Sequence, residues 1–112
     1  ILRQVPDLQV IAAHFGGWRA WAHSYECPLP SCVLYDTSST LPMIPRDMVL
    51  RMLDRFGPER FLFGTDFPMW SPKEELARFL ALGLGEDVNE KILYGNFMKL
   101  FDLHDEDETE GA

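Results

Sequence analysis

The sequence lacks several features that would place the chain in common functional classes. Its 112 residues contain no uninterrupted apolar run long enough to cross a bilayer, and the amino end shows no signal-peptide pattern. It also has no basic patch, since 18 acidic residues outnumber 10 lysines and arginines for a formal net charge of −8. We therefore expect a protein that neither spans a membrane nor binds nucleic acid.

Cysteine is scarce as well. Cys27 and Cys32 stand in the segment Cys-Pro-Leu-Pro-Ser-Cys, and no second pair exists. Their spacing differs from the two-residue gap that is typical of zinc and redox motifs. We predict two reduced, structural thiols and therefore a cytoplasmic protein.

The acidic residues are unevenly distributed. Residues 105–112 hold five of the 18 acids and no base, whereas the rest of the chain is nearly balanced. An apolar fraction of 46% and an aromatic fraction of 12% are typical of a globular protein with one core. We predict one domain over residues 1–104 and an acidic disordered tail over residues 105–112.

Three short apolar runs alternate with helical patterns. The runs cover residues 8–13, 32–35 and 61–66, and each is typical of a strand buried on both faces. Helical patterns cover residues 45–56, 72–82 and 87–101, and a short one lies near residues 18–23. This order predicts an α/β fold with parallel strands and outer helices.

Local signals predict where the helices begin and end. Pro45 suits the first helical position, and Gly57 ends that helix. Ser71 precedes Pro-Lys-Glu as an N-cap. Asp87 is the predicted cap of the last helix, with Glu90 as its capping-box partner.

Two polar side chains follow predicted strands. Asp66 comes directly after Phe-Leu-Phe-Gly-Thr, and Pro68 ends that strand, while His14 follows the first strand. Parallel α/β proteins place their chemistry at the carboxyl ends of strands, where an imidazole and a carboxylate can bind a metal or exchange protons. The residues alone also allow a structural histidine and a turn-forming aspartate. Asp36 and Thr37 follow the second strand, and we interpret them as Asx-type caps rather than loop-orienting residues.

Four motifs occur in an order that is characteristic of a known family. They begin at His14 (His-Phe-Gly-Gly), Asp36 (Asp-Thr-Ser-Ser), Gly64 (Gly-Thr-Asp-Phe-Pro) and Ile92 (Ile-Leu-Tyr-Gly-Asn-Phe-Met-Lys-Leu-Phe). From about residue 6 to residue 103 the chain resembles the carboxyl-terminal part of the amidohydrolase-related metal-dependent hydrolases. That family includes aminocarboxymuconate semialdehyde decarboxylase and related aromatic-acid decarboxylases.

The resemblance implies a (β/α)8 TIM barrel with a divalent metal, commonly zinc, at the carboxyl ends of the strands. The chain would supply about three βα units, equivalent to barrel strands six to eight. Asp66 would bind the metal or hold the nucleophilic water and shuttle its proton, and His14 would polarise the substrate or the water. In a complete barrel Trp18 and Trp70 would line an aromatic substrate pocket, with buried packing or exposure in the fragment as the alternatives for each.

The chain departs from the family pattern in its histidines. The family takes most of its metal ligands from a His-x-His pair on the first strand and a histidine on strand five. This chain has His14, His23 and His104, none of them in such a pair. A whole barrel needs about 250 residues, and the chain opens with Ile-Leu-Arg-Gln rather than Met. We therefore expect a fragment of a longer polypeptide that is inactive in isolation and need not hold the metal alone.

Two functions follow from these observations. The first is a carboxyl-terminal fragment of a metal-dependent hydrolase or decarboxylase that acts on a small organic acid through metal-activated water. The alternative is a non-catalytic α/β module that self-associates or docks on an amino-terminal barrel segment, because three strands leave sheet edges unpaired. The sequence leaves both open.

Overall fold

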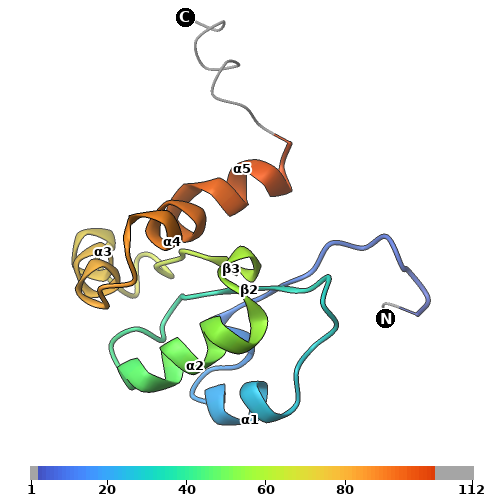
Figure 1. Ribbon diagram of the computed structural model, residues 1–112, viewed down its shortest axis with the longest axis horizontal. Coiled ribbons are helices and arrows are strands. Elements are labelled where there is room, and N and C mark those ends of the chain that lie inside the picture. Colours follow the sequence, from blue (N-terminus) through green and yellow to red (C-terminus); the bar gives the residue numbers. More distant parts are fainter. Residues whose placement is uncertain (1–2, 103–112) are drawn as a thin grey trace, which may run out of the picture.

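The computed structural model describes residues 3–102, whose centre is a sheet of three short parallel strands (Figure 1). The strands are β1 (Ile11–Ala12), β2 (Leu34–Asp36) and β3 (Phe61–Leu62), in the order β1-β2-β3. Ile11 lies opposite Leu34 and Tyr35 opposite Phe61, and both pairings are parallel. The predicted parallel α/β arrangement is confirmed.

Helices connect and cover these strands. They are α1 (Trp21–Glu26), α2 (Arg46–Phe56), α3 (Pro72–Ala81), α4 (Glu86–Glu90) and α5 (Asn96–Leu100), together with the 3-10 turns η1 (His14–Gly16) and η2 (Pro58–Arg60) and the π-helix η3 (Lys91–Gly95). Figure 1 shows α1 and α2 on one side of the strands and α4 and α5 on the other. Within residues 3–102 no helix has the length and apolarity needed to cross a membrane.

The helix boundaries confirm the predictions for Ser71 and for Gly57, which is the C-cap of α2, and correct two others. The Ser71 hydroxyl accepts a hydrogen bond from the Glu74 N–H, as predicted for the start of α3. Pro45 is the N-cap of α2 rather than its first residue, because its ψ of 142° is extended. Asp87 is not a cap: Gly85, with a φ of 98°, precedes the first residue of α4, so Asp87 lies within the first helical turn.

The third strand is shorter than its apolar run predicts. It ends at Leu62, because the N–H of Phe63 donates to the carbonyl of Ile92 and the chain then leaves the sheet. Residues 63–66 therefore form a connection beyond the sheet, and Asp66 lies on that connection rather than on the strand itself.

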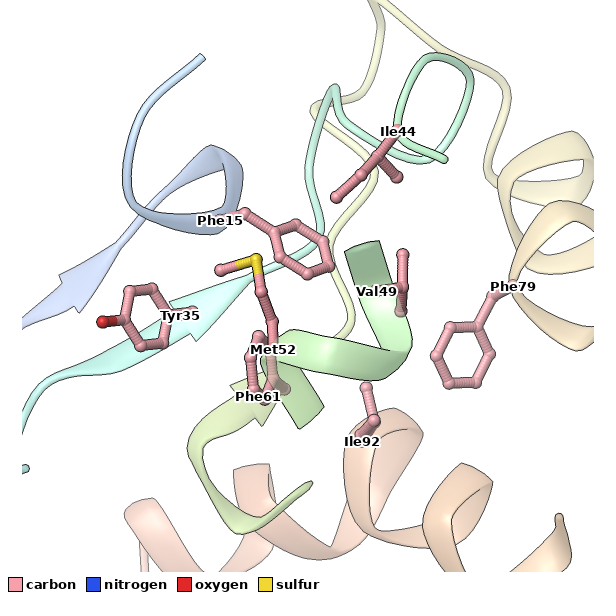
Figure 2. Close-up of a cluster of buried hydrophobic side chains, with 8 residues drawn as sticks. All are labelled: Phe15, Tyr35, Ile44, Val49, Met52, Phe61, Phe79 and Ile92. Atoms are coloured by element: carbon pink, nitrogen blue, oxygen red, sulfur yellow. The ribbon is translucent and has the colours of Figure 1, made fainter. Parts of the chain in front are cut away.

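The main hydrophobic core packs the strands against α2 and α3. Figure 2 shows its buried side chains, which are Phe15, Tyr35, Ile44, Val49, Met52, Phe61, Phe79 and Ile92. The ring of Tyr35 stacks between those of Phe56 and Phe61, with centroid distances of 5.3 and 5.5 Å. Because these rings come from β2, β3 and α2, their burial holds the strand ends in place.

A buried asparagine attaches the last helix to the sheet. Asn96 Nδ2 donates to the carbonyl of Pro58 at 2.8 Å and to that of Phe61 at 2.7 Å. Carbonyl groups away from water need hydrogen-bond partners, and the Asn96 amide supplies one to each of these two. Asn96 therefore has a structural hydrogen-bonding role.

The remaining sequence expectations concern the cysteines and the tail. Cys27 and Cys32 are both free thiols, as predicted, but both are exposed rather than part of a core. The predicted acidic tail at residues 105–112, and His104 beside it, lie outside the described residues.

Candidate active site

The carboxyl ends of the three strands carry the polar residues that the sequence singles out. His14 follows β1, and Asp66 follows β3. Asp36 is the last residue of β2, and residues 37–40 come directly after it. Since the strands are parallel and β2 lies between the other two, these residues share one edge of the sheet. This is the position at which barrel enzymes hold their active sites.

His14 is placed by a tight left-handed turn. Its φ is 60°, that of Phe15 is 57° and that of Gly16 is 92°. The turn buries Phe15, whose ring lies 5.4 Å from that of Phe61, while His14 stays half-buried at the sheet edge. Non-glycine residues in this conformation cost free energy and occur often at functional sites.

Gly16 is required in this turn for a second reason. A Cβ at Gly16 would lie 2.7 Å from Ser24 Oγ and 3.0 Å from Tyr35 Cε1. The absent side chain thus makes room for α1 and β2, and the positive φ also favours glycine. Gly16 therefore lets the turn after β1 pass close to α1 and β2.

Asp36 connects the turn after β1 to the segment after β2. Its Oδ1 accepts hydrogen bonds from the N–H of His14 at 3.0 Å, the N–H of Ser38 at 3.0 Å and the hydroxyl of Ser38 at 2.6 Å. The Ser38 N–H bond is the Asx-type cap that the sequence favours. The His14 bond is the loop-orienting role, so Asp36 performs both.

The hydrogen bonds of His14 define its tautomer when the ring is neutral. Nδ1 lies 2.7 Å from the carbonyl oxygen of Ser38 and 2.9 Å from its hydroxyl. A carbonyl only accepts, so Nδ1 must carry the hydrogen, and the Ser38 hydroxyl gives its own hydrogen to Asp36. In the neutral ring Nε2 is then the atom with a free electron pair, available to a ligand or a proton.

Asp66 is held by a second set of contacts. Its φ is 57°, and its carbonyl accepts from the N–H of Met69 at 2.8 Å across a turn that contains the cis Phe67–Pro68 peptide bond. The Ser39 hydroxyl donates to Asp66 Oδ2 at 2.6 Å. This bond orients the carboxylate and leaves Oδ1 to bind an ion or take up a proton.

The segment 37–40 is a buried run of four hydroxyl residues. Thr37, Ser38, Ser39 and Thr40 are each at most 6% exposed. The Thr37 hydroxyl donates to the carbonyl of Gly64 at 3.2 Å and accepts from its N–H at 3.1 Å, while Thr40 donates to the Ser38 carbonyl at 2.9 Å. Every hydroxyl of the run therefore has a partner, and together they join β1, β2 and the connection after β3.

The structure brings three of the four predicted site residues together. His14 and Asp66 are joined through Ser38 and Ser39, and the indole Nε1 of Trp70 donates to Ser39 Oγ at 2.9 Å. Trp18 differs, since its side chain is 58% exposed and lies beside Arg19. Ser38 and Ser39 are the residues that sequence reasoning missed. Their signal was four consecutive hydroxyl residues directly after a strand.

A metal site cannot be built from these residues alone. Within residues 3–102, no group of three or more His, Cys, Asp or Glu side chains is arranged to hold an ion. Asp66 and His14 offer a carboxylate and an imidazole, which are both common ligands of divalent metals.

Comparison with known proteins identifies the family. A profile of the Amidohydrolase family matches residues 1–103, so the chain belongs to this family, as the resemblance in its motifs indicates. No curated protein matches the chain.

Solved structures share the fold. A TIM-barrel protein of Bordetella bronchiseptica is 29% identical, with a TM-score of 0.70 over 90% of this chain and 36% of that one. A dihydroxybenzoic acid decarboxylase of Polaromonas, solved with manganese and the inhibitor 2-nitroresorcinol, is 20% identical, with a TM-score of 0.72 over 90% of this chain and 36% of that one. An amidohydrolase of Burkholderia multivorans with bound zinc is 19% identical, with a TM-score of 0.67 over 91% of this chain and 50% of that one.

The chain therefore corresponds to part of a TIM barrel. It spans between 36% and 50% of the length of these structures, and the predicted fold class is confirmed.

Proposed function

We propose that this chain forms the carboxyl-terminal part of a metal-dependent hydrolase or decarboxylase that acts on a small organic acid. Membership of the amidohydrolase family supports the class. The observation that carries the site is the hydrogen-bonded bridge of Asp36, Ser38 and Ser39, which holds His14 and Asp66 at one edge of the sheet. The comparisons lend no support to the alternative of a non-catalytic module.

Asp66 is the residue of this chain that we assign to the metal. Ser39 occupies Oδ2, so Oδ1 is the oxygen that would contact a divalent ion. Since the described residues supply no group of three ligands, the other metal ligands would come from the remaining strands of the barrel. We favour zinc, and manganese is the alternative, because each is bound in a solved relative. Such an ion, when bound, makes water more acidic and polarises a substrate oxygen.

The chain's own side chains would move and stabilise charge. For hydrolysis, the Asp66 carboxylate would take up the proton that the attacking water loses. For decarboxylation, His14 protonated at Nε2 stabilises the negative charge that develops on the substrate. Throughout, Nδ1 stays bonded to the Ser38 carbonyl, which fixes the ring orientation while Nε2 gains or loses a proton.

The partner that completes this site is an amino-terminal barrel segment. In the described part of the chain, β1 and β3 each pair with β2 alone, so each has an unpaired edge. Apolar side chains on and beyond these strands are exposed: Ile11 of β1 by 42%, and Phe67 on the turn after β3 by 71%. Further barrel strands would satisfy the free backbone groups and cover this apolar surface.

Metal analysis and turnover of the complete barrel protein test the proposal. The protein is purified without chelators, its metal content is measured by mass spectrometry, and hydroxylated benzoic acids serve as the first substrate panel. Asp66→Asn should lose metal and turnover together. His14→Gln should keep the metal and lose about 10²- to 10⁴-fold in turnover, the usual contribution of an acid–base residue.

The exposed Asp54 on α2 provides the control. Asp54→Asn removes the same charge from an exposed side chain outside the bridge and should leave both measurements unchanged. An Asp66→Asn protein with full metal content and normal turnover would refute the assignment. Tight stoichiometric zinc on the isolated 112-residue chain would show that the other strands are not needed for binding.

A further inference from the structure

We infer that Trp70 is a positioning residue that acts on Asp66 through Ser39, rather than a wall of the substrate pocket. This inference rests on the proposed role of Asp66. It follows from the direction of two consecutive hydrogen bonds, from the Trp70 indole to Ser39 Oγ at 2.9 Å and from Ser39 Oγ to Asp66 Oδ2 at 2.6 Å.

The chemistry of the three groups sets that direction. An indole N–H can only donate, so Ser39 Oγ must accept from Trp70. The hydroxyl has one hydrogen and two lone pairs, and because the carboxylate of Asp66 only accepts, the hydroxyl gives it that hydrogen while one lone pair accepts from the indole. Trp70 thereby prevents the Ser39 hydroxyl from rotating away from Asp66, and Oδ1 keeps one orientation toward the ion.

Ser39 and Trp70 are both held in place by the surrounding structure. Ser39 is 4% exposed, and its φ of 51° belongs to the turn after β2. The guanidinium of Arg78 on α3 lies over the Trp70 ring, with Cζ 5.9 Å from the ring centroid. Arg78 in turn donates to the fully buried Glu75 on the same helix. Since α3 begins just after Trp70, the helix fixes the indole and the indole fixes the serine.

The first test detects the relay itself in the 112-residue chain. With 15N-labelled tryptophan, Trp70→Phe identifies the Trp70 indole N–H resonance among those of the three tryptophans. In Ser39→Ala this resonance should move upfield, while those of Trp18 and Trp21 should not move. Ser39→Gly is the second variant, because glycine adopts a φ of 51° without strain and removes only the hydroxymethyl group. A Trp70 resonance that stays in place in both variants overturns the inference.

The second test measures the consequence in the complete enzyme. Ser39→Gly and Trp70→Phe should each weaken zinc binding, measured by competition with a chromogenic chelator, by about 10- to 100-fold. Because they act on one carboxylate in series, the double variant should be no weaker than Ser39→Gly alone. Their turnover should fall at an unchanged KM. Additive losses, or a raised KM with normal zinc affinity in Trp70→Phe, would return Trp70 to the substrate pocket and overturn the inference.

Two controls separate this inference from the proposed function. Trp18→Phe makes the same chemical change at the other predicted tryptophan, and it should leave zinc affinity unchanged. Asp66→Asn with normal zinc affinity would refute Asp66 as a ligand, and the indole resonance would still decide whether Trp70 positions that side chain. If Asp66→Asn loses zinc while Ser39→Gly and Trp70→Phe both keep wild-type zinc affinity, the role of Trp70 is overturned and the role of Asp66 as a ligand stands.

Discussion

Replacing Asp36 with alanine should destabilise the protein more than any other surface-accessible change at the sheet edge. One oxygen of Asp36 accepts three hydrogen bonds, two from backbone N–H groups and one from the Ser38 hydroxyl, at 3.0, 3.0 and 2.6 Å. Alanine leaves the N–H groups of His14 and Ser38 without this acceptor, and each such loss costs about 1–3 kcal/mol. We expect a total of about 4 kcal/mol, a large share of the 5–15 kcal/mol that is typical of a whole domain.

Asparagine at position 36 provides the graded comparison. Its carbonyl oxygen can accept the same three bonds, so only the charge assistance is lost and the expected cost is about 1–2 kcal/mol. Asp54→Ala, on the exposed face of α2, should change the free energy of unfolding by less than about 0.5 kcal/mol.

Urea unfolding followed by circular dichroism measures all three variants. With a typical m value of about 2 kcal/mol/M, Asp36→Ala should lower the midpoint by about 2 M. The amides of His14 and Ser38 should also exchange with deuterium faster in that variant, because they lose their acceptor. Equal midpoints for Asp36→Ala and Asp54→Ala would refute the reasoning that this carboxylate connects the two loops.

Three further predictions concern stability and use the same unfolding assay. Gly16→Ala should lower the free energy of unfolding more than Gly85→Ala. Both glycines have a positive φ, but only a Cβ at Gly16 would meet other atoms, at 2.7 Å, whereas one at Gly85 would point into open space. Equal losses would mean that φ alone matters. Asn96→Ala should cost about 2–3 kcal/mol through two lost hydrogen bonds, one to a buried and one to a part-buried carbonyl, and an unchanged midpoint would contradict its attachment role. Met52→Ala should cost about 2–5 kcal/mol, since the side chain is fully buried in the core of Figure 2, and a loss below 1 kcal/mol would mean that the core collapses into the space.

The fold was predictable to the extent that it depends on local patterns. Apolar runs bounded by turn residues identified the three strands, and Ser71 identified the start of α3. The end of the third strand was predicted wrongly because a tertiary contact competed with the local signal. The predicted strand runs from Phe61 to Asp66, yet the N–H of Phe63 bonds to Ile92, a residue far along the chain, and the strand ends at Leu62.

The sequence by itself determined that His14 and Asp66 each follow a strand, because the strand and turn signals lie within a few residues of each. Only the tertiary structure decided what holds their side chains. The hydrogen bonds of Asp36, Ser39 and Trp70 at this edge join residues 22, 27 and 31 positions apart, a separation that no local pattern encodes. Parallel strand packing brings those residues together, and the buried hydroxyls between them then bond to the carboxylates, to the rings of His14 and Trp70 and to the nearby backbone.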